Sequence, residues 1–204
     1  MRPTLAVIVT VATALGGAGV APAHAATKKR CAHSAGATTL KKTPLVWAYR
    51  SKGSEFGAKS YACDRPTGRT LLLHKNTGGA ATTDIILDAV AVAGRVVAFH
   101  VQASSESSYD FVRSYDVRSG RRLRSSGRFP QTAPTGDYPL PRVAIATNAR
   151  GAIVWLAGGV LRALDRGGAR VLARETAGPI SGVSTTARTA RWTQGARKRH
   201  ASLR

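Results

Sequence analysis

Acidic residues and cysteines are both scarce in this chain. Its 204 residues include ten Asp and Glu and two Cys, against 31 Lys and Arg, so the formal net charge is +21. An excess of one sign on this scale creates a surface field that attracts polyanions. The two cysteines, Cys31 and Cys63, lack the C-x-x-C spacing of a zinc site or a dithiol redox pair.

Sequence motifs for catalysis and cofactor binding are missing as well. The sequence contains no H-E-x-x-H, G-x-S-x-G, S-x-x-K or P-loop pattern, and no calcium loop of the D-x-D-x-D-G type. We therefore expect no catalytic, cofactor-binding or metal-binding residue, while a triad assembled from distant segments stays open. The dispersed groups are His33, His74, His100, His200, Asp84, Asp88 and Asp110, of which we expect His100 to be an ordinary strand residue.

The first 25 residues predict a secretory signal peptide. Arg2 supplies the positive start, Leu5 to Val20 form a core of apolar and small residues, and Ala23-His24-Ala25 is a small-x-small cleavage site. A membrane anchor needs about 20 strongly apolar residues, and neither this run nor any later one provides them. We expect a secreted protein, extracellular or associated with the cell wall, cut near Ala25. A polar segment at 26–40 would then precede one domain at 41–204.

An oxidising compartment changes the interpretation of the two cysteines. Since secreted chains form disulfides, Cys31 and Cys63 are predicted to pair. Closing a loop of about 33 residues would stabilise the fold by roughly 3–4 kcal/mol in the chain-entropy model. The bond would fix the polar N-terminal segment to the first repeat unit.

What the sequence does contain is a turn that occurs three times at intervals of about 50 residues. Each copy begins with Asp after an apolar run, passes through a turn that contains Gly, and ends with Arg. Asp stabilises such turns by side-chain bonds to nearby backbone, and Gly accepts positive φ at little cost. We interpret these Asp residues as turn formers. The copies run from Asp64 to Arg69, from Asp116 to Arg121 and from Asp165 to Arg170.

Short runs of Val, Ile, Leu and aromatic residues surround each turn and predict strands. Four short antiparallel strands per unit, in about four units of about 45 residues, are typical of a β-propeller. The fold class we expect is therefore all-β and propeller-like, with a β-sandwich as the alternative. We expect the aromatic residues of corresponding strands to fill the space between neighbouring sheets: Trp47, Phe99, Trp155 and Trp192.

The arrangement of strand, Asp-x-x-Ser/Thr-Gly-Arg turn and strand resembles secreted bacterial propeller-repeat proteins of the TolB-like, YVTN-like and WD40-like kinds. The resemblance covers roughly residues 40–204, and the third turn departs from it. It implies a scaffold for interaction, and it carries over no ligand and no catalytic residue. A small ring closes if Ala37 to Leu40 complete the last blade. Otherwise, the blades form an open stack that invites a homodimer through its edges.

The basic residues form two clusters, which we treat as candidate anion-binding sites because Arg matches phosphate and carboxylate geometry. Scattered Arg with no partner is the alternative. Nucleic acid is not expected, since aromatic platforms are not interleaved with the Arg and export removes the chain from the genome. An anionic cell-envelope polymer or an acidic protein is the expected partner. The clusters are Arg118, Arg121, Arg122, Arg124 and Arg128, and Arg197, Lys198 and Arg199.

These observations favour a non-catalytic binding or interaction module at the bacterial cell envelope, working without a cofactor. The alternative function is an exported hydrolase for carbohydrate or ester substrates, with catalytic groups drawn from separate blades. Specific function would lie in what the repeats do not share, such as the segments Ser104 to Ser108 and Thr132 to Pro141.

Overall fold

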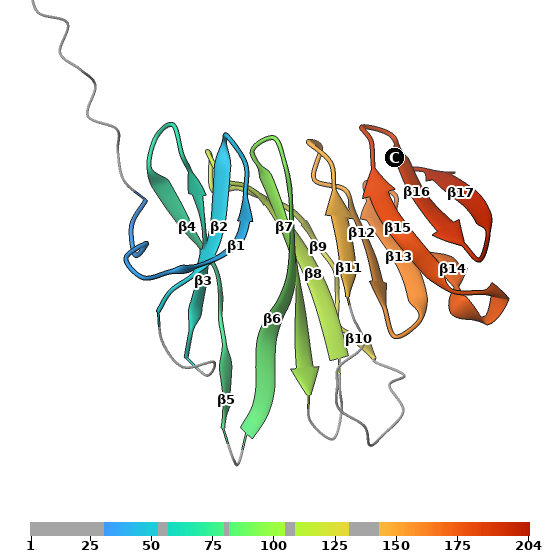
Figure 1. The fold of residues 1–204 in the computed structure, drawn as a ribbon, viewed down its shortest axis with the longest axis horizontal. Helices are drawn as coiled ribbons and strands as arrows, with labels where there is room; N and C mark the ends of the chain where they lie inside the picture. Colours follow the sequence, from blue (N-terminus) through green and yellow to red (C-terminus); the bar gives the residue numbers. More distant parts are fainter. Residues whose placement is uncertain (1–30, 53–56, 80–81, 105–108, 131–142) are drawn as a thin grey trace, which may run out of the picture.

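A computed structural model describes residues 31–52, 57–79, 82–104, 109–130 and 143–204, and the segments Ser104 to Ser108 and Thr132 to Pro141 lie mostly or wholly outside them. Apart from one 3-10 turn at Glu175–Ala177, the regular structure in these ranges is antiparallel β-sheet. Four small sheets follow one another along the chain and along the long axis of the molecule (Figure 1). The all-β prediction is confirmed, and the four repeat units correspond to the four sheets.

The first sheet has four strands and the second has six. The first sheet has the order β1-β2-β3-β4. The second has the order β10-β8-β7-β6-β5, and β9 also pairs with β8. The first comprises β1 (Thr38–Lys42), β2 (Val46–Arg50), β3 (Lys59–Asp64) and β4 (Arg69–Lys75). The second comprises β5 (Thr77–Gly79), β6 (Thr82–Ala93), β7 (Val96–Ser104), β8 (Tyr109–Asp116), β9 (Arg122–Ser125) and β10 (Phe129–Pro130).

The third and fourth sheets repeat the same up-and-down order. The third has the order β11-β12-β13-β14, and the fourth has three strands in the order β15-β16-β17. The third comprises β11 (Ala144–Thr147), β12 (Ile153–Ala157), β13 (Val160–Asp165) and β14 (Gly168–Arg174). The fourth comprises β15 (Ile180–Thr185), β16 (Thr189–Gln194) and β17 (Arg197–Ser202).

Apolar side chains lie on both faces of the inner strands because each inner sheet packs against two neighbours. In β12 all five residues are buried, with Val154 in the core shared with the fourth sheet and Trp155 in the core shared with the second. Strands buried on both faces are continuous apolar runs instead of alternating ones. This explains why the sequence at Ile153 to Ala157 has no two-residue period.

The recurring aromatic position faces the preceding sheet. In each of these sheets, one residue of the aromatic strand lies opposite the Asp position of the turn, which Ser202 occupies in the fourth sheet. Phe99, Trp155 and Trp192 each lie three residues after that residue. Each packs into the core that its sheet shares with the sheet before it. Their predicted packing role is confirmed. The equivalent residue in the first sheet is Tyr49, not Trp47 as the sequence pattern suggested.

Among the described residues no sheet precedes the first one, and residues 31–37, which we call the cap segment, cover its outer face instead. The Cys31–Cys63 disulfide is formed, with 5.8 Å between the Cα atoms. Tyr49 is fully buried beneath the segment and donates a hydrogen bond to the carbonyl of Ala32. The ring of His33 stacks on Tyr61 at 5.0 Å between centroids. The predicted disulfide is therefore confirmed, and it anchors a cover for an otherwise open apolar face.

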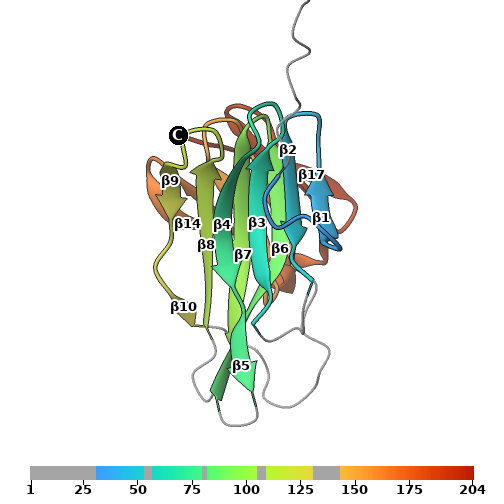
Figure 2. The ribbon, with the colours of Figure 1, turned by 90° about the vertical axis from the view of Figure 1, so that its left-hand side faces the viewer.

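The stack is not closed by its N-terminal segment. Thr38 to Lys42 pair with β2 of the first sheet, so the segment that could have completed the last blade belongs to the first. Viewed from one end, the first sheet lies in front and the last behind (Figure 2). Within the described part of the chain, no helix is long and apolar enough to cross a membrane.

Candidate functional site

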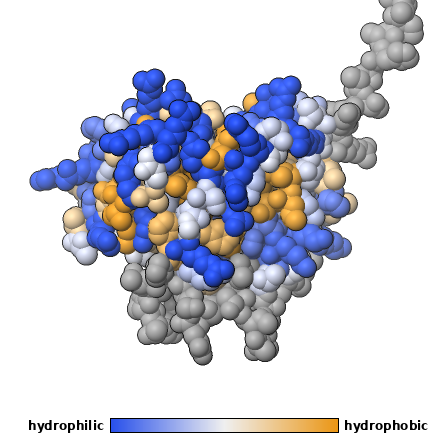
Figure 3. Space-filling view, turned by 180° about the vertical axis from the view of Figure 1, so that it is seen from behind, coloured by the Kyte–Doolittle hydropathy of each residue, from blue (hydrophilic) through white to orange (hydrophobic). Residues whose placement is uncertain are grey.

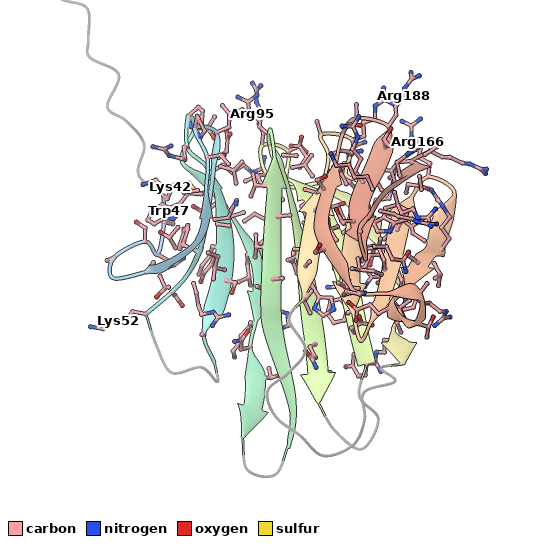
Figure 4. The ribbon with its side chains drawn as sticks, turned by 45° about the vertical axis from the view of Figure 1, so that its right-hand side comes forward. Lys42, Trp47, Lys52, Arg95, Arg166 and Arg188 are labelled. Atoms are coloured by element: carbon pink, nitrogen blue, oxygen red, sulfur yellow. A yellow bond between two sulfur atoms is a disulfide. The ribbon has the colours of Figure 1, made fainter. Side chains whose placement is uncertain are left out.

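Seven turns, at least one from each sheet, lie at one end of the molecule, because alternate connections of an up-and-down sheet share an end (Figure 1). They join β1 to β2, β3 to β4, β6 to β7, β8 to β9, β11 to β12, β13 to β14 and β15 to β16. Arginines occur in almost every one of these turns. Figure 4 shows Arg95, Arg166 and Arg188 at this end and Lys52 toward the other. We call this end the turn face. Its cations are Arg65, Arg69, Arg95, Arg118, Arg121, Arg150, Arg166, Arg170, Arg188 and Arg204.

The same backbone contact fixes the two turns of a sheet against each other. In the first, second and fourth sheets, the residue after the Asp position (Ser202 in the fourth sheet) donates its N–H to a backbone carbonyl in an earlier turn. These earlier turns join β1 to β2, β6 to β7 and β15 to β16. These bonds join Arg65 to Leu45, Val117 to Arg95 and Leu203 to Arg188, at 2.9, 3.0 and 2.7 Å. In the third sheet, the equivalent N–H, that of Arg166, binds the carbonyl of Arg204 at 3.1 Å. The repeated geometry therefore presents the arginines at matching heights along the stack.

Three aspartates are the only acidic residues of these turns, and all three make internal bonds. Asp64 is fully buried and pairs with Arg95 of the next sheet, with 3.2 Å between Oδ1 and Nε. Asp116 accepts hydrogen bonds from the backbone N–H and the hydroxyl of Ser119. Asp165 pairs with Arg170, with 2.8 Å between Oδ2 and Nη1. The aspartates thus act as turn formers, as predicted, and their carboxylates are bound by groups of the protein itself.

Hydrogen bonding sets the protonation of two of these carboxylates. Burial alone would raise the pKa of Asp165, but bonds from the Arg204 N–H, the Arg170 side chain and the Gly167 N–H hold it below its usual value. The backbone N–H of Ser119 is the main cause of the lowered pKa of Asp116. Both groups therefore stay ionised at neutral pH and remain tied to their turns.

Five of the turn-face arginines are free to contact a partner. Arg118, Arg150, Arg166, Arg188 and Arg204 are exposed, and their guanidinium groups make no hydrogen bond or ion pair with another residue of the described ranges. Figure 3 shows hydrophilic residues predominating along the upper margin, with hydrophobic residues in patches below it. The turn face can therefore offer several unpaired forks to one extended anion.

The structure divides the first predicted cluster. Arg118 and Arg121 lie on the turn face, whereas Arg122 and Arg124 belong to the outer strand β9. Arg122 is opposite Tyr115 and Arg124 opposite Ser114, so the two side chains leave on opposite faces of the sheet. Arg128 lies lower still, with its guanidinium 4.5 Å from the centroid of the Tyr109 ring. The five residues follow one edge of the second sheet and do not form a single patch.

The second predicted cluster forms the first half of β17 and is likewise divided. Arg197 and Arg199 alternate with Lys198 and His200, and all four are exposed. Lys198 and His200 are opposite Thr193 and Arg191 of β16, and these residues line an open pocket of about 560 Å³ on the outer face of the last sheet. This face is polar, and a polar outer face keeps the end of a repeat stack soluble.

The structure also brings together a histidine and an aspartate that the sequence does not connect. His100 and Asp110 are fully buried between the second and third sheets, with 3.0 Å between Nε2 and Oδ2. Arg162 lies at the same interface, where burial lowers its pKa and the charge of Asp110 opposes that effect. His100 is a strand residue, as predicted. In the register of β7 with β8, Gln102 is opposite Asp110, so His100, two residues earlier on the same face, is a diagonal neighbour of Asp110. The strand register is therefore the signal that could have indicated the pair.

Both side chains of this pair are buried. One surface pocket on the last sheet and another between the first two sheets are both lined by other residues. Within the described ranges, no group of three or more His, Cys, Asp or Glu side chains could hold a metal ion. No protein-family model matches the chain, and no curated protein matches it with significant similarity.

The sequence identified only part of the turn face. Runs of adjacent basic residues in β9 and β17 predicted anion-binding clusters there. The turn-face residues Arg95, Arg150, Arg166 and Arg188 are instead isolated in sequence. Their common feature is position within the repeat, since each lies in a turn at the same end of its sheet. Alignment of the units by their turns, and not by charge density, would have found them.

Proposed function

We propose that this protein is a secreted, non-catalytic binding module that holds an anionic polymer of the bacterial cell envelope against its turn face. One observation carries the proposal: arginines recur in the turns at one end of successive sheets, while the aspartates of those turns bind inward. Several guanidinium groups in fixed positions suit a chain that bears charge at regular intervals.

We further propose that the four sheets are blades of one propeller-like repeat, arranged as an open stack. The matching turn contacts and the aromatic position that always faces the preceding sheet support this. The cap segment at one end and the polar face of β16 and β17 at the other explain how an open arrangement avoids association through its ends.

Binding to purified cell envelope at increasing ionic strength tests the proposal. Exposed charges are screened over about 10 Å at 0.1 M salt, so the bound fraction should fall steeply between roughly 50 and 300 mM. Neutral polysaccharide serves as the control and should not retain the protein. Envelope binding that does not change with salt, or that is absent even at the lowest salt concentration, would remove the basis for an electrostatic role.

A further inference from the structure

A groove of about 350 Å³ lies between the first and second sheets, away from the turn face. One wall comes from His74 on β4, and the other from Tyr109, Phe111 and Arg113 on β8. The short stretch from Ser126 to Arg128 closes one side. A volume of this size suits one ring of a small ligand.

The β8 wall follows from strand geometry. Tyr109, Phe111 and Arg113 occupy alternate positions, so their side chains leave on one face about 6–7 Å apart. The residue between the two aromatics, Asp110, points to the opposite face and pairs with His100. The acidic group of this strand is therefore directed away from the groove, and none of the lining residues is acidic.

The two arginines of the groove are held against its aromatic rings. The guanidinium of Arg113 lies 4.6 Å from the Phe111 centroid, and that of Arg128 lies 4.5 Å from the Tyr109 centroid. Contact with a ring face orients a guanidinium without using its N–H donors. The Nε of Arg113 is buried and has no hydrogen-bond acceptor among the described residues.

We propose that this groove binds a sugar ring that carries a carboxylate, of the hexuronate type. The aromatic side chains of Tyr109 and Phe111 line the groove and offer apolar contact to a pyranose, and the guanidinium groups of Arg113 and Arg128 match the two oxygens of a carboxylate. This site is separate from the turn face and does not depend on the function proposed for it.

Calorimetric titration of the intact protein with D-glucuronate tests the inference. Saturable binding is expected, and D-glucose and the methyl ester of glucuronate, which lack the charge, should bind at least tenfold more weakly. Inorganic phosphate should also bind at least tenfold more weakly because it has no ring. Equal affinity for phosphate and glucuronate would show a simple anion site and overturn the proposal, as would absence of binding.

Variants locate the site. Arg128 is exposed, so Arg128→Gln should leave the fold intact and reduce glucuronate affinity about tenfold, whereas Lys75→Gln removes the same charge near the groove and should not change it. An equal loss in both variants would indicate a diffuse field and contradict a built site. Envelope binding should be unchanged in Arg128→Gln, which separates this inference from the proposed function.

Discussion

Asp64, Asp116 and Asp165 are alike in sequence but have different surroundings in the folded chain. Asp116 lies at a half-buried turn and binds only within its own loop, through Ser119. Asp165 is 3% exposed and also accepts the N–H of Arg204, which belongs to the next sheet. The same turn residue therefore stabilises a loop in one unit and joins two sheets in another.

This difference predicts how stability depends on pH. The pKa of Asp165 is lowered on folding, so its stabilisation is present above the unfolded value of about 4 and is lost as pH falls through the folded value. Asp165→Asn should cost about 1–3 kcal/mol at neutral pH and should reduce the loss of stability below about pH 4. Urea denaturation at neutral pH and at two acidic pH values measures both effects.

Asp116→Asn is the matched control for this measurement, because it makes the same substitution at a turn that does not join two sheets. A smaller loss of stability is expected there. Equal losses in the two variants would show that the bond between Asp165 and Arg204 adds nothing to the turn itself.

At the level of strands and sheets, turn chemistry made the fold largely predictable. The predicted fourth strands, Thr70 to His74, Arg122 to Arg124 and Val171 to Arg174, correspond to β4, β9 and β14. Local signals failed where tertiary packing decides. Both Trp47 and Tyr49 are aromatic and lie in β2, and only the register with β3 shows that Tyr49 has the repeated position.

The candidate sites were less predictable than the strands for the same reason. The groove joins His74 to residues of β8 more than 30 positions later, and His100 meets Asp110 only through the register of β7 with β8. Neither relation leaves a pattern in the sequence, because both depend on how strands pair and how sheets stack. The disulfide was predictable because two cysteines allow one pairing.

The cap segment leads to a prediction about the first sheet. Replacing both cysteines by serine, Cys31→Ser with Cys63→Ser, removes the link that holds the segment over Tyr49. The oxidised protein should exceed the variant in unfolding free energy by roughly 3–4 kcal/mol in the chain-entropy model. Chemical denaturation without reductant gives this difference.

Hydrogen exchange shows where that stability is lost. Amides of β2 and β3 should lose protection in the double-serine variant, while those of β12 and β13 in the third sheet should change less. Equal loss in both sheets would mean that the disulfide acts through the unfolded chain alone and that the cap segment contributes no local cover.

In the molecule as a whole, the ends and the faces of the stack have different characters. The cap segment covers one end, the polar residues of the last sheet form the other, and the arginines gather on the turn face. The turn face and the packing between sheets result from local features that recur along the stack. These are a turn that exposes its arginine, an aromatic residue that faces the sheet before it, and an aspartate that is bound within the protein. A basic surface longer than any single sheet follows from this repetition.

Two triple variants of equal charge test whether the turn face is the binding surface. Arg118, Arg166 and Arg188 of the turn face are changed to Gln in one, and Lys52, Lys59 and Lys75, exposed and outside that face, in the other. Affinity for poly(glycerol phosphate) is measured at several salt concentrations. The first variant should bind at least tenfold more weakly, with the slope of log K against log salt reduced by roughly 2, and the second should bind like the unmodified protein. Equal losses in the two variants would contradict the proposed function, because net charge alone, and not the turn face, would then explain binding.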